Sequence, residues 1–75
     1  MKKPLTRPTF DCHEMTYQDV MDKFENWLWL NQTKTPLEVI TGNSDKMKMI
    51  ITRLLKHNNI EYTIPVYNQG MIIIL

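Results

Sequence analysis

The sequence predicts a small α/β domain, a two-layer sandwich with the element order β-α-β-α-β-β. Three observations favour this fold class. The chain has 75 residues, which is enough for one domain but not for two. Its hydrophobic content of 43% is ordinary for a globular protein and too high for a disordered one. Two segments with apolar residues at helical spacing alternate with short strand-like segments along the chain.

The first strand is expected over residues 9–13, and the first helix from Thr16 to about Gln32. Thr16 and Asp19 form a variant of the capping box, which marks the start of a helix. The apolar residues at helical spacing are Tyr17, Val20, Met21, Phe24, Trp27 and Leu28. Pro36 cannot continue the helix, so a loop is expected before the next strand.

The second strand is expected over residues 37–41, and a tight turn leads from it into the second helix. Ser44 or Asp45 caps that helix, which is expected to end at residues 57–59, where asparagine suits a left-handed turn. Its apolar stripe consists of Met47, Ile50, Ile51, Leu54 and Leu55.

Two strands complete the predicted domain. Residues 60–66 alternate between apolar and polar side chains, and Pro65, which cannot donate to a sheet ladder, indicates an edge strand. Residues 68–70 form a turn. Residues 71–75 are all apolar, which is typical of a central strand buried on both faces. If both helices lie on one face, half of this strand is exposed, and such a face predicts self-association or a protein partner.

Composition excludes several classes of protein. The formal net charge of +1 gives no global argument for nucleic-acid binding. Cys12 is the only cysteine, so a disulfide framework within the chain is excluded. Residues 1–8 are expected to be a basic, flexible tail, and no apolar segment of a signal peptide follows them. No run reaches the roughly 20 apolar residues of a membrane span, so a soluble, cytoplasmic protein without a membrane partner is expected.

The predicted topology brings two polar segments together. Each strand-helix-strand step is expected to cross over with a right hand, so the first two strands run parallel. Their C-terminal ends then share one edge of the sheet, which is where ligands bind in open α/β sheets. Asp11 and His13 are therefore expected beside the loop of residues 41–44.

The same two segments resemble the motifs of a known family. Residues 10–14, Phe-Asp-Cys-His-Glu, resemble the Leu-Asp-Leu-His-Gly motif that opens the Smr (small MutS-related) domain. Residues 39–44, Val-Ile-Thr-Gly-Asn-Ser, resemble its second motif, a strand that ends in histidine or threonine and is followed by Gly-x-Gly. The resemblance covers residues 9–75, which would form a single Smr-like domain.

The resemblance implies a fold and a function. The fold is a four-stranded mixed sheet with two helices, similar to the C-terminal domain of translation initiation factor three, in which the last strand lies between the second and the third and is antiparallel to the rest. The function is nucleic-acid binding, with endonuclease activity on RNA or nicking of DNA in several members. The implicated aspartate and histidine correspond to Asp11 and His13. The glycine loop corresponds to Thr41, Gly42, Asn43 and Ser44, and Lys48 is the nearest match to an arginine of the second helix.

The residue types themselves suit acid-base chemistry. Asp11 and His13 are two apart on a predicted strand, so their side chains share a face. His13 titrates near neutral pH and could activate a 2′-hydroxyl or a water, with Asp11 orienting its ring. Asp11 could instead help hold a divalent cation, magnesium or manganese, or the pair could be an ordinary hydrogen bond at a strand end. Cys12 points to the opposite face and is expected to be buried, not paired with His13.

A phosphate-binding surface is expected next to this pair. The loop of residues 41–44 leads into a helix N-terminus, where free backbone N–H groups and the helix dipole favour phosphate. Lys46, Lys48 and Arg53 make the second helix basic and extend this surface into a predicted phosphate track. An ordinary capped turn and a solvated helix face explain the same residues equally well.

Two further functions stay open at this point. Glu14, Ser44 and Asp45 depart from the family motifs and put bulk or negative charge beside the pair, which would suit a nucleic-acid-binding module that has lost catalysis. Trp27 and Trp29 cannot both face the core from one helix, so one of them is expected to be exposed for base stacking or for a protein partner. An interaction domain that uses this tryptophan and the apolar sheet face is the remaining alternative.

Overall fold

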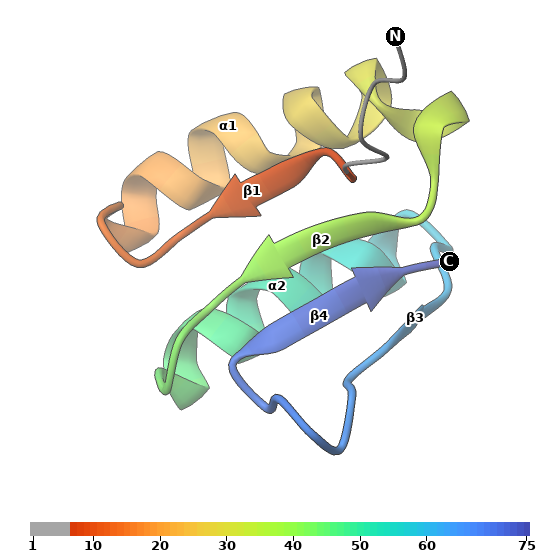
Figure 1. The fold of residues 1–75 in the computed structure, drawn as a ribbon. Coiled ribbons are helices and arrows are strands. Elements are labelled where there is room, and N and C mark those ends of the chain that lie inside the picture. Colours follow the sequence, from red (N-terminus) through yellow and green to blue (C-terminus); the bar gives the residue numbers. More distant parts are fainter. Residues whose placement is uncertain (1–6) are drawn as a thin grey trace, which may run out of the picture.

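A computed structural model describes residues 7–75 and has the predicted two layers, a four-stranded mixed sheet and a pair of helices (Figure 1). The elements in chain order are β1 (Thr9–Asp11), α1 (Tyr17–Leu30), the short 3-10 helix η1 (Gln32–Lys34), β2 (Leu37–Ile40), α2 (Asp45–His57), β3 (Tyr62–Thr63) and β4 (Met71–Ile74).

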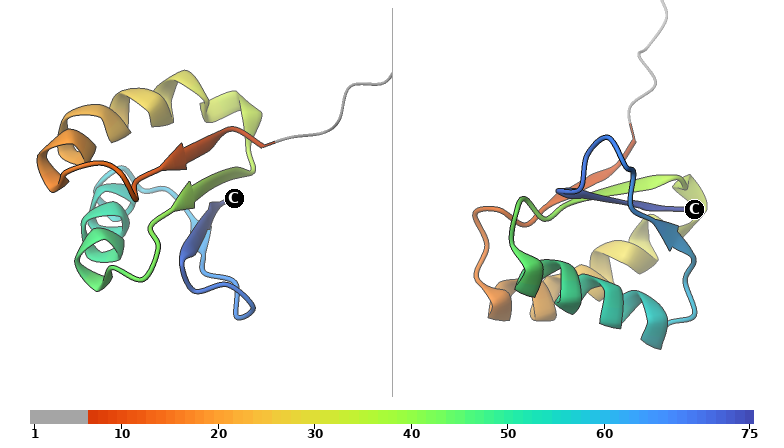
Figure 2. Two further views of the ribbon diagram at one scale, coloured as in Figure 1. Left: turned by 60° about the vertical axis from the view of Figure 1, so that its left-hand side comes forward. Right: turned by 90° about the horizontal axis from the view of Figure 1, so that it is seen from below.

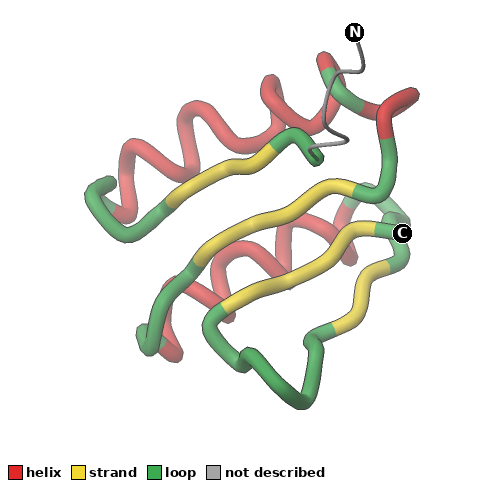
Figure 3. Tube along the Cα trace, viewed as in Figure 1, coloured by secondary structure: helices red, strands yellow, loops and turns green. Residues whose placement is uncertain are grey.

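The four strands lie in the order β1-β2-β4-β3 (Figure 3). β1 and β2 are parallel, with Phe10 opposite Val39 and Asp11 opposite Ile40. β4 runs antiparallel to both of its neighbours, β2 and β3. The expected placement of the last strand in the centre of the sheet and of the preceding strand at its edge is therefore confirmed.

Both helices cover the same face of the sheet, and the core lies between these two layers (Figure 2). The buried residues of α1 and α2 recur every four positions: Val20, Phe24 and Leu28 on α1, and Met47, Ile51 and Leu55 on α2. Phe10 of β1 contacts Phe24 edge-on, with the ring centroids 5.2 Å apart. Trp27 joins these two rings, whereas Trp29 is 45% exposed, so the prediction that one tryptophan is exposed is confirmed.

Polar caps start both helices where they were expected. The Thr16 hydroxyl accepts the backbone N–H of Asp19, and the Asp19 carboxylate accepts the backbone N–H of Thr16, which completes the capping box. The Ser44 hydroxyl accepts the backbone N–H of Met47 at the start of α2. Past the end of α2, Asn59 has a φ of 57°, as expected for an asparagine in a left-handed turn.

All four strands are shorter than predicted, and the difference exceeds one residue in β1 and β3. The strand expected over residues 60–66 pairs with β4 only at Tyr62 and Thr63. Ile60 and Ile64 still pack against the core, but Val66 is 91% exposed, because Pro65 has no N–H for the ladder and the chain turns away from the sheet after it. β1 ends at Asp11 instead of residue 13, because the Asp11 side chain bonds to the backbone two residues ahead and turns the chain.

The central strand β4 is buried on one face only. Ile72 and Ile74 point into the core, while Met71 and Ile73 are partly exposed on the opposite face. The expectation that residues 71–75 are buried on both faces is wrong, because both helices lie on the same side. The uncovered face is the one for which self-association or a protein partner is expected, and that partner stays a prediction.

The predicted tail of residues 1–8 falls mostly outside the described residues. Arg7 and Pro8 are described and lie along β2, where the Pro8 carbonyl accepts the backbone N–H of Glu38. A guanidinium nitrogen of Arg7 is 3.4 Å from the Glu38 carboxylate. Within residues 7–75, neither helix has the length and apolar character that crossing a bilayer requires.

A matched pair of alanine variants tests the orientation of α2. Ile51 is fully buried and Met49 is exposed two residues away on the same helix. Ile51→Ala is expected to lower the free energy of unfolding by about 2–5 kcal/mol, because it leaves a cavity between helix and sheet. Met49→Ala is expected to change it by less than about 0.5 kcal/mol. Urea denaturation followed by circular dichroism measures both, and equal losses would contradict the packing described here.

Candidate functional site

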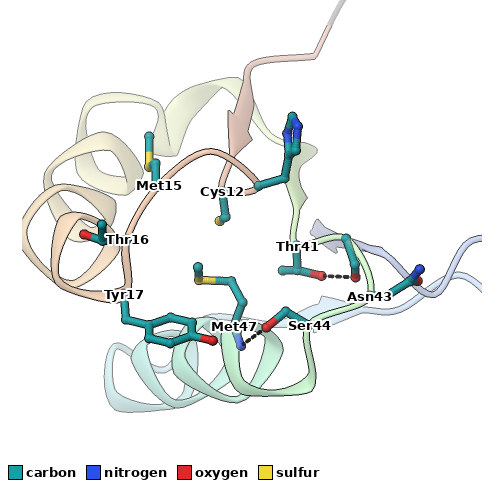
Figure 4. A pocket seen from close by; sticks show the side chains of 10 residues that line it. Cys12, Met15, Thr16, Tyr17, Thr41, Asn43, Ser44 and Met47 are labelled. Atoms are coloured by element: carbon teal, nitrogen blue, oxygen red, sulfur yellow. Dashed lines mark hydrogen bonds between the residues drawn. The ribbon is translucent and has the colours of Figure 1, made fainter.

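The loops that follow β1 and β2 line a common groove with a volume of about 770 Å³ (Figure 4). It lies at the C-terminal edge of the two parallel strands, as the topology predicted. The lining residues are Cys12, His13, Met15, Thr16, Tyr17, Thr41, Gly42, Asn43, Ser44 and Met47. His13 and the loop of residues 41–44 are thus brought together. Asp11 contacts His13 but does not line the groove.

Asp11 holds His13 through two hydrogen bonds to one oxygen. Oδ1 of Asp11 accepts the backbone N–H of His13 at 3.0 Å and also lies 3.0 Å from the ring nitrogen Nδ1. When Nδ1 carries the proton of the neutral ring, it donates to Asp11, and Nε2 keeps a free lone pair. The pair was expected to meet across one face of a strand, but it meets through the turn that ends β1.

This contact changes the titration of both side chains. The backbone N–H and the side chain of His13 donate to Asp11 and lower the pKa of its carboxyl below the ordinary value. The hydrogen bond and the negative charge of Asp11 raise the pKa of His13, and Glu14 adds to the same effect. Because the side chains of His13 and Asp11 are 60% and 50% exposed, a substrate can reach the pair from solvent.

The alternative of a binding module without catalysis depends on Glu14 or Asp45 obstructing the pair, and neither residue lines the groove. A carboxylate oxygen of Glu14 lies 3.8 Å from Nε2 of His13, but the Glu14 side chain is 86% exposed and can swing away. Asp45 is the first residue of α2 and is exposed. The groove itself is therefore not filled by either carboxylate, but that of Glu14 lies beside Nε2.

The loop of residues 41–44 is anchored by a glycine that the sequence did not single out. The carbonyl of Gly70 accepts the backbone N–H groups of Thr41 and Gly42 at 2.8 and 3.1 Å, and the Thr41 hydroxyl at 3.2 Å. These N–H groups were expected to face a phosphate, but they bind Gly70. Gly42 has a φ of +66°, a conformation that L side chains rarely adopt. Sequence pattern could mark Gly70 only as part of a turn, because its partners lie almost 30 residues away.

The basic residues of α2 lie along this helix and do not line the groove. Lys46 and Arg53 are seven residues apart and share one exposed face, whereas Lys48 is partly buried and lies off that face. The ammonium of Lys46 sits 4.5 Å from the centre of the Tyr17 ring, at the start of α1. A positive charge therefore stands at the side of the groove.

The residues present do not form a metal centre of their own. Within residues 7–75, no three His, Cys, Asp or Glu side chains converge in a way that could hold a metal ion. Oδ1 of Asp11 already accepts two N–H bonds, which leaves Oδ2 as the one oxygen of this carboxylate without a bond from His13. Because magnesium is commonly held by one or two carboxylates together with substrate phosphates, the expected role of Asp11 toward magnesium or manganese stays a prediction.

Cys12 is buried between the pair and the core. Its side chain is fully covered, and burial, with a smaller effect of the nearby Asp11 charge, raises the pKa of its thiol to about 11. At neutral pH the thiol stays protonated, so it is a poor nucleophile. The expectation that Cys12 acts as a small hydrophobic residue and not as the partner of His13 is confirmed.

The Asp11 contact makes a prediction about the titration of His13. Asp11→Asn removes the negative charge, so the pKa of His13 is expected to fall towards its ordinary value. NMR titration of the imidazole in a His57→Gln background measures it, because His13 is then the only histidine. Asp22→Asn, an equal charge change on α1 away from the pair, is the control. A pKa of His13 that stays raised in Asp11→Asn would disprove the contact.

The chain was compared with models of known protein families, with curated proteins and with solved structures, and it matches none of them.

Proposed function

We propose that this chain is an Smr-like nucleic-acid-binding domain that cleaves RNA, with His13 as the general base and Asp11 as its positioning residue. The observation that carries the proposal is the 3.0 Å contact between Nδ1 of His13 and Asp11, which leaves Nε2 without a hydrogen bond at the rim of the groove, 3.8 Å from a carboxylate oxygen of Glu14. A ring held at one nitrogen and free at the other is the arrangement by which a carboxylate prepares histidine for proton transfer.

The proposed reaction uses the ribose itself as the nucleophile. Nε2 of neutral His13 takes the proton of the 2′-hydroxyl, and the 2′-oxygen forms a bond to the adjacent phosphorus. The bond from phosphorus to the 5′-oxygen of the next nucleotide breaks. That oxygen receives a proton from the imidazolium, directly or through water, which restores neutral His13. The products are a 2′,3′-cyclic phosphate and a 5′-hydroxyl. In DNA, which lacks the 2′-hydroxyl, His13 would have to activate a water instead.

The electrostatics of the pair support this role. Asp11 raises the pKa of His13, which makes Nε2 a stronger base. The charge of Asp11 also stabilises the imidazolium that forms in the reaction. Lys46 and Arg53 supply positive charge along α2 for the phosphate backbone. The reaction as proposed takes no step through a metal ion.

A second candidate is nucleic-acid binding without cleavage. The carboxylate of Glu14 lies 3.8 Å from Nε2, the nitrogen that would act as the base. If this contact persists when nucleic acid is bound, it occupies the base and prevents proton transfer, while the basic face of α2 still binds phosphates.

The test is cleavage of an end-labelled single-stranded RNA and of a DNA duplex, each with magnesium, with manganese and with chelator. His13→Ala is expected to slow RNA cleavage by about 10²–10⁴-fold, the usual contribution of a general base. His57→Ala, the other histidine of the chain, is the matched control. A 2′-deoxy substitution at the cleaved position is expected to abolish cleavage there, and cleavage that needs a metal would contradict the reaction proposed here.

The pH dependence separates the role of Asp11 from a merely structural one. The rate is expected to rise with pH as His13 loses its proton and then to level off. Asp11→Asn lowers the pKa of His13, so the rise is expected at lower pH and the plateau rate is expected to fall. Cleavage that survives His13→Ala would overturn the proposed site. Salt-sensitive binding without cleavage would favour the second candidate.

A further inference from the structure

Most of the groove beside His13 is built from side chains that do not suit phosphate. Cys12 and Met47 are buried at its floor, and their side chains point into its centre (Figure 4). Met15 and Tyr17 form the wall on the side of α1. Thioether and aromatic surfaces attract flat, polarisable groups, whereas a phosphate gains nothing from them.

The hydroxyl groups that line the groove are engaged within the fold. The Thr16 hydroxyl accepts the N–H of Asp19, and the Ser44 hydroxyl accepts the N–H of Met47, so both serve as helix caps. The Thr41 hydroxyl donates to the carbonyl of Gly70. Asn43 is exposed, and its amide points away from the centre of the groove (Figure 4). A ligand in the groove therefore meets mainly thioether and aromatic surfaces, which suit the flat face of a nucleobase.

The aromatic wall is held in place by charge. The Lys46 ammonium lies over the Tyr17 ring at 4.5 Å from its centre, which limits the movement of the ring and brings a cation to the rim. The groove thus combines an apolar floor, an aromatic wall and a cation, and His13 lies at its rim. Its volume of about 770 Å³ lies within the range of small-molecule sites.

We infer that this groove binds a single unpaired nucleobase, stacked against Tyr17 and packed on Met15 and Met47. The inference rests on the proposed function, because it makes the base in the groove the neighbour of the bond that His13 cleaves. A base inside a duplex is stacked and paired and cannot enter, so the substrate class is single-stranded RNA or an unpaired nucleotide in a loop or bulge.

The six methionines of the chain report the site without any substitution. The full chain with ¹³C-labelled methionine methyl groups is titrated with a 2′-O-methyl hexanucleotide, which binds like RNA but offers no 2′-hydroxyl for cleavage. Ring currents of the bound base are expected to shift the methyl signals of Met15 and Met47, while those of Met21 and Met49 stay in place. A shift confined to Met71 would place the strand on the open sheet face and overturn the inference.

Affinity gives the second measurement. Fluorescence anisotropy of the labelled hexanucleotide is expected to show about tenfold weaker binding for Tyr17→Ala, the usual loss of one base–aromatic stack. Tyr67→Ala removes an exposed tyrosine outside the groove and is expected to leave the affinity unchanged. The same strand annealed to its complement is expected to bind more weakly and equally to both variants. Equal affinity of Tyr17→Ala and the unmodified chain would overturn the inference.

The outcomes test nucleobase binding in the groove separately from RNA cleavage by His13. Methyl shifts at Met15 and Met47 without cleavage of the ribose strand would retain the nucleobase site and reject the endonuclease. Cleavage that depends on His13, with those methyl signals unmoved, would retain the endonuclease and reject the nucleobase site. Binding of an apolar peptide in the groove in place of the hexanucleotide would reject the nucleobase site as well.

Discussion

The parallel pairing of β1 with β2 is the constraint on which the candidate site depends. Asp11 lies opposite Ile40, so both strands end at the same level, and the last bond between them runs from the N–H of Cys12 to the carbonyl of Ile40 at 2.8 Å. The two loops therefore leave the sheet side by side. Antiparallel strands would send these loops to opposite edges, and His13 would face solvent without the groove.

Both helices pack on one face of the sheet, and the apolar core between these layers is separate from the candidate site at the sheet edge. Among residues 7–75, every buried residue is apolar except Thr41, whose hydroxyl and N–H are both bound to Gly70. Cys12 marks the boundary, because it is the last fully buried residue after β1 and is followed at once by an exposed His13. A histidine at position 12 instead of 13 would be buried, so it could not exchange protons with a substrate.

The parts of the fold that sequence could predict are those with local signals. The caps at Thr16 and Ser44 and the left-handed Asn59 depend on residue types within a few positions, and the handedness rule for crossovers supplied the parallel pairing. The contact of Asp11 with His13 was predictable for the same reason, although it forms through a turn. The positions of Met15, Tyr17 and Met47 in the groove could not be predicted. Apolar residues in or beside a helical stripe give no sign that they line a groove.

The length of β3 shows a different limit. Ile60 and Ile64 alternate as strand residues do and pack against the core, yet only two residues nearby bond to β4. Alternation reports which side chains turn inward, but not whether the backbone has a partner strand within reach. The same applies to the Gly70 anchor, which is a contact between distant segments and leaves no periodic trace in the sequence.

Gly70 links the loop before β4 to the loop after β2. A Cβ atom at position 70 would lie 3.2 Å from the carbonyl oxygen of Gly42 and 3.3 Å from its Cα, so a side chain here would push the two backbones apart by a few tenths of an ångström. The Gly70 carbonyl in turn takes up the N–H groups of Thr41 and Gly42, which fixes the loop that faces His13. The geometry of the groove is therefore set from both sides: by Asp11, which turns β1 into its loop, and by Gly70, which secures the loop after β2. Neither residue lines the groove: Asp11 acts through its carboxylate, which accepts the backbone N–H of His13, and Gly70 acts through its carbonyl.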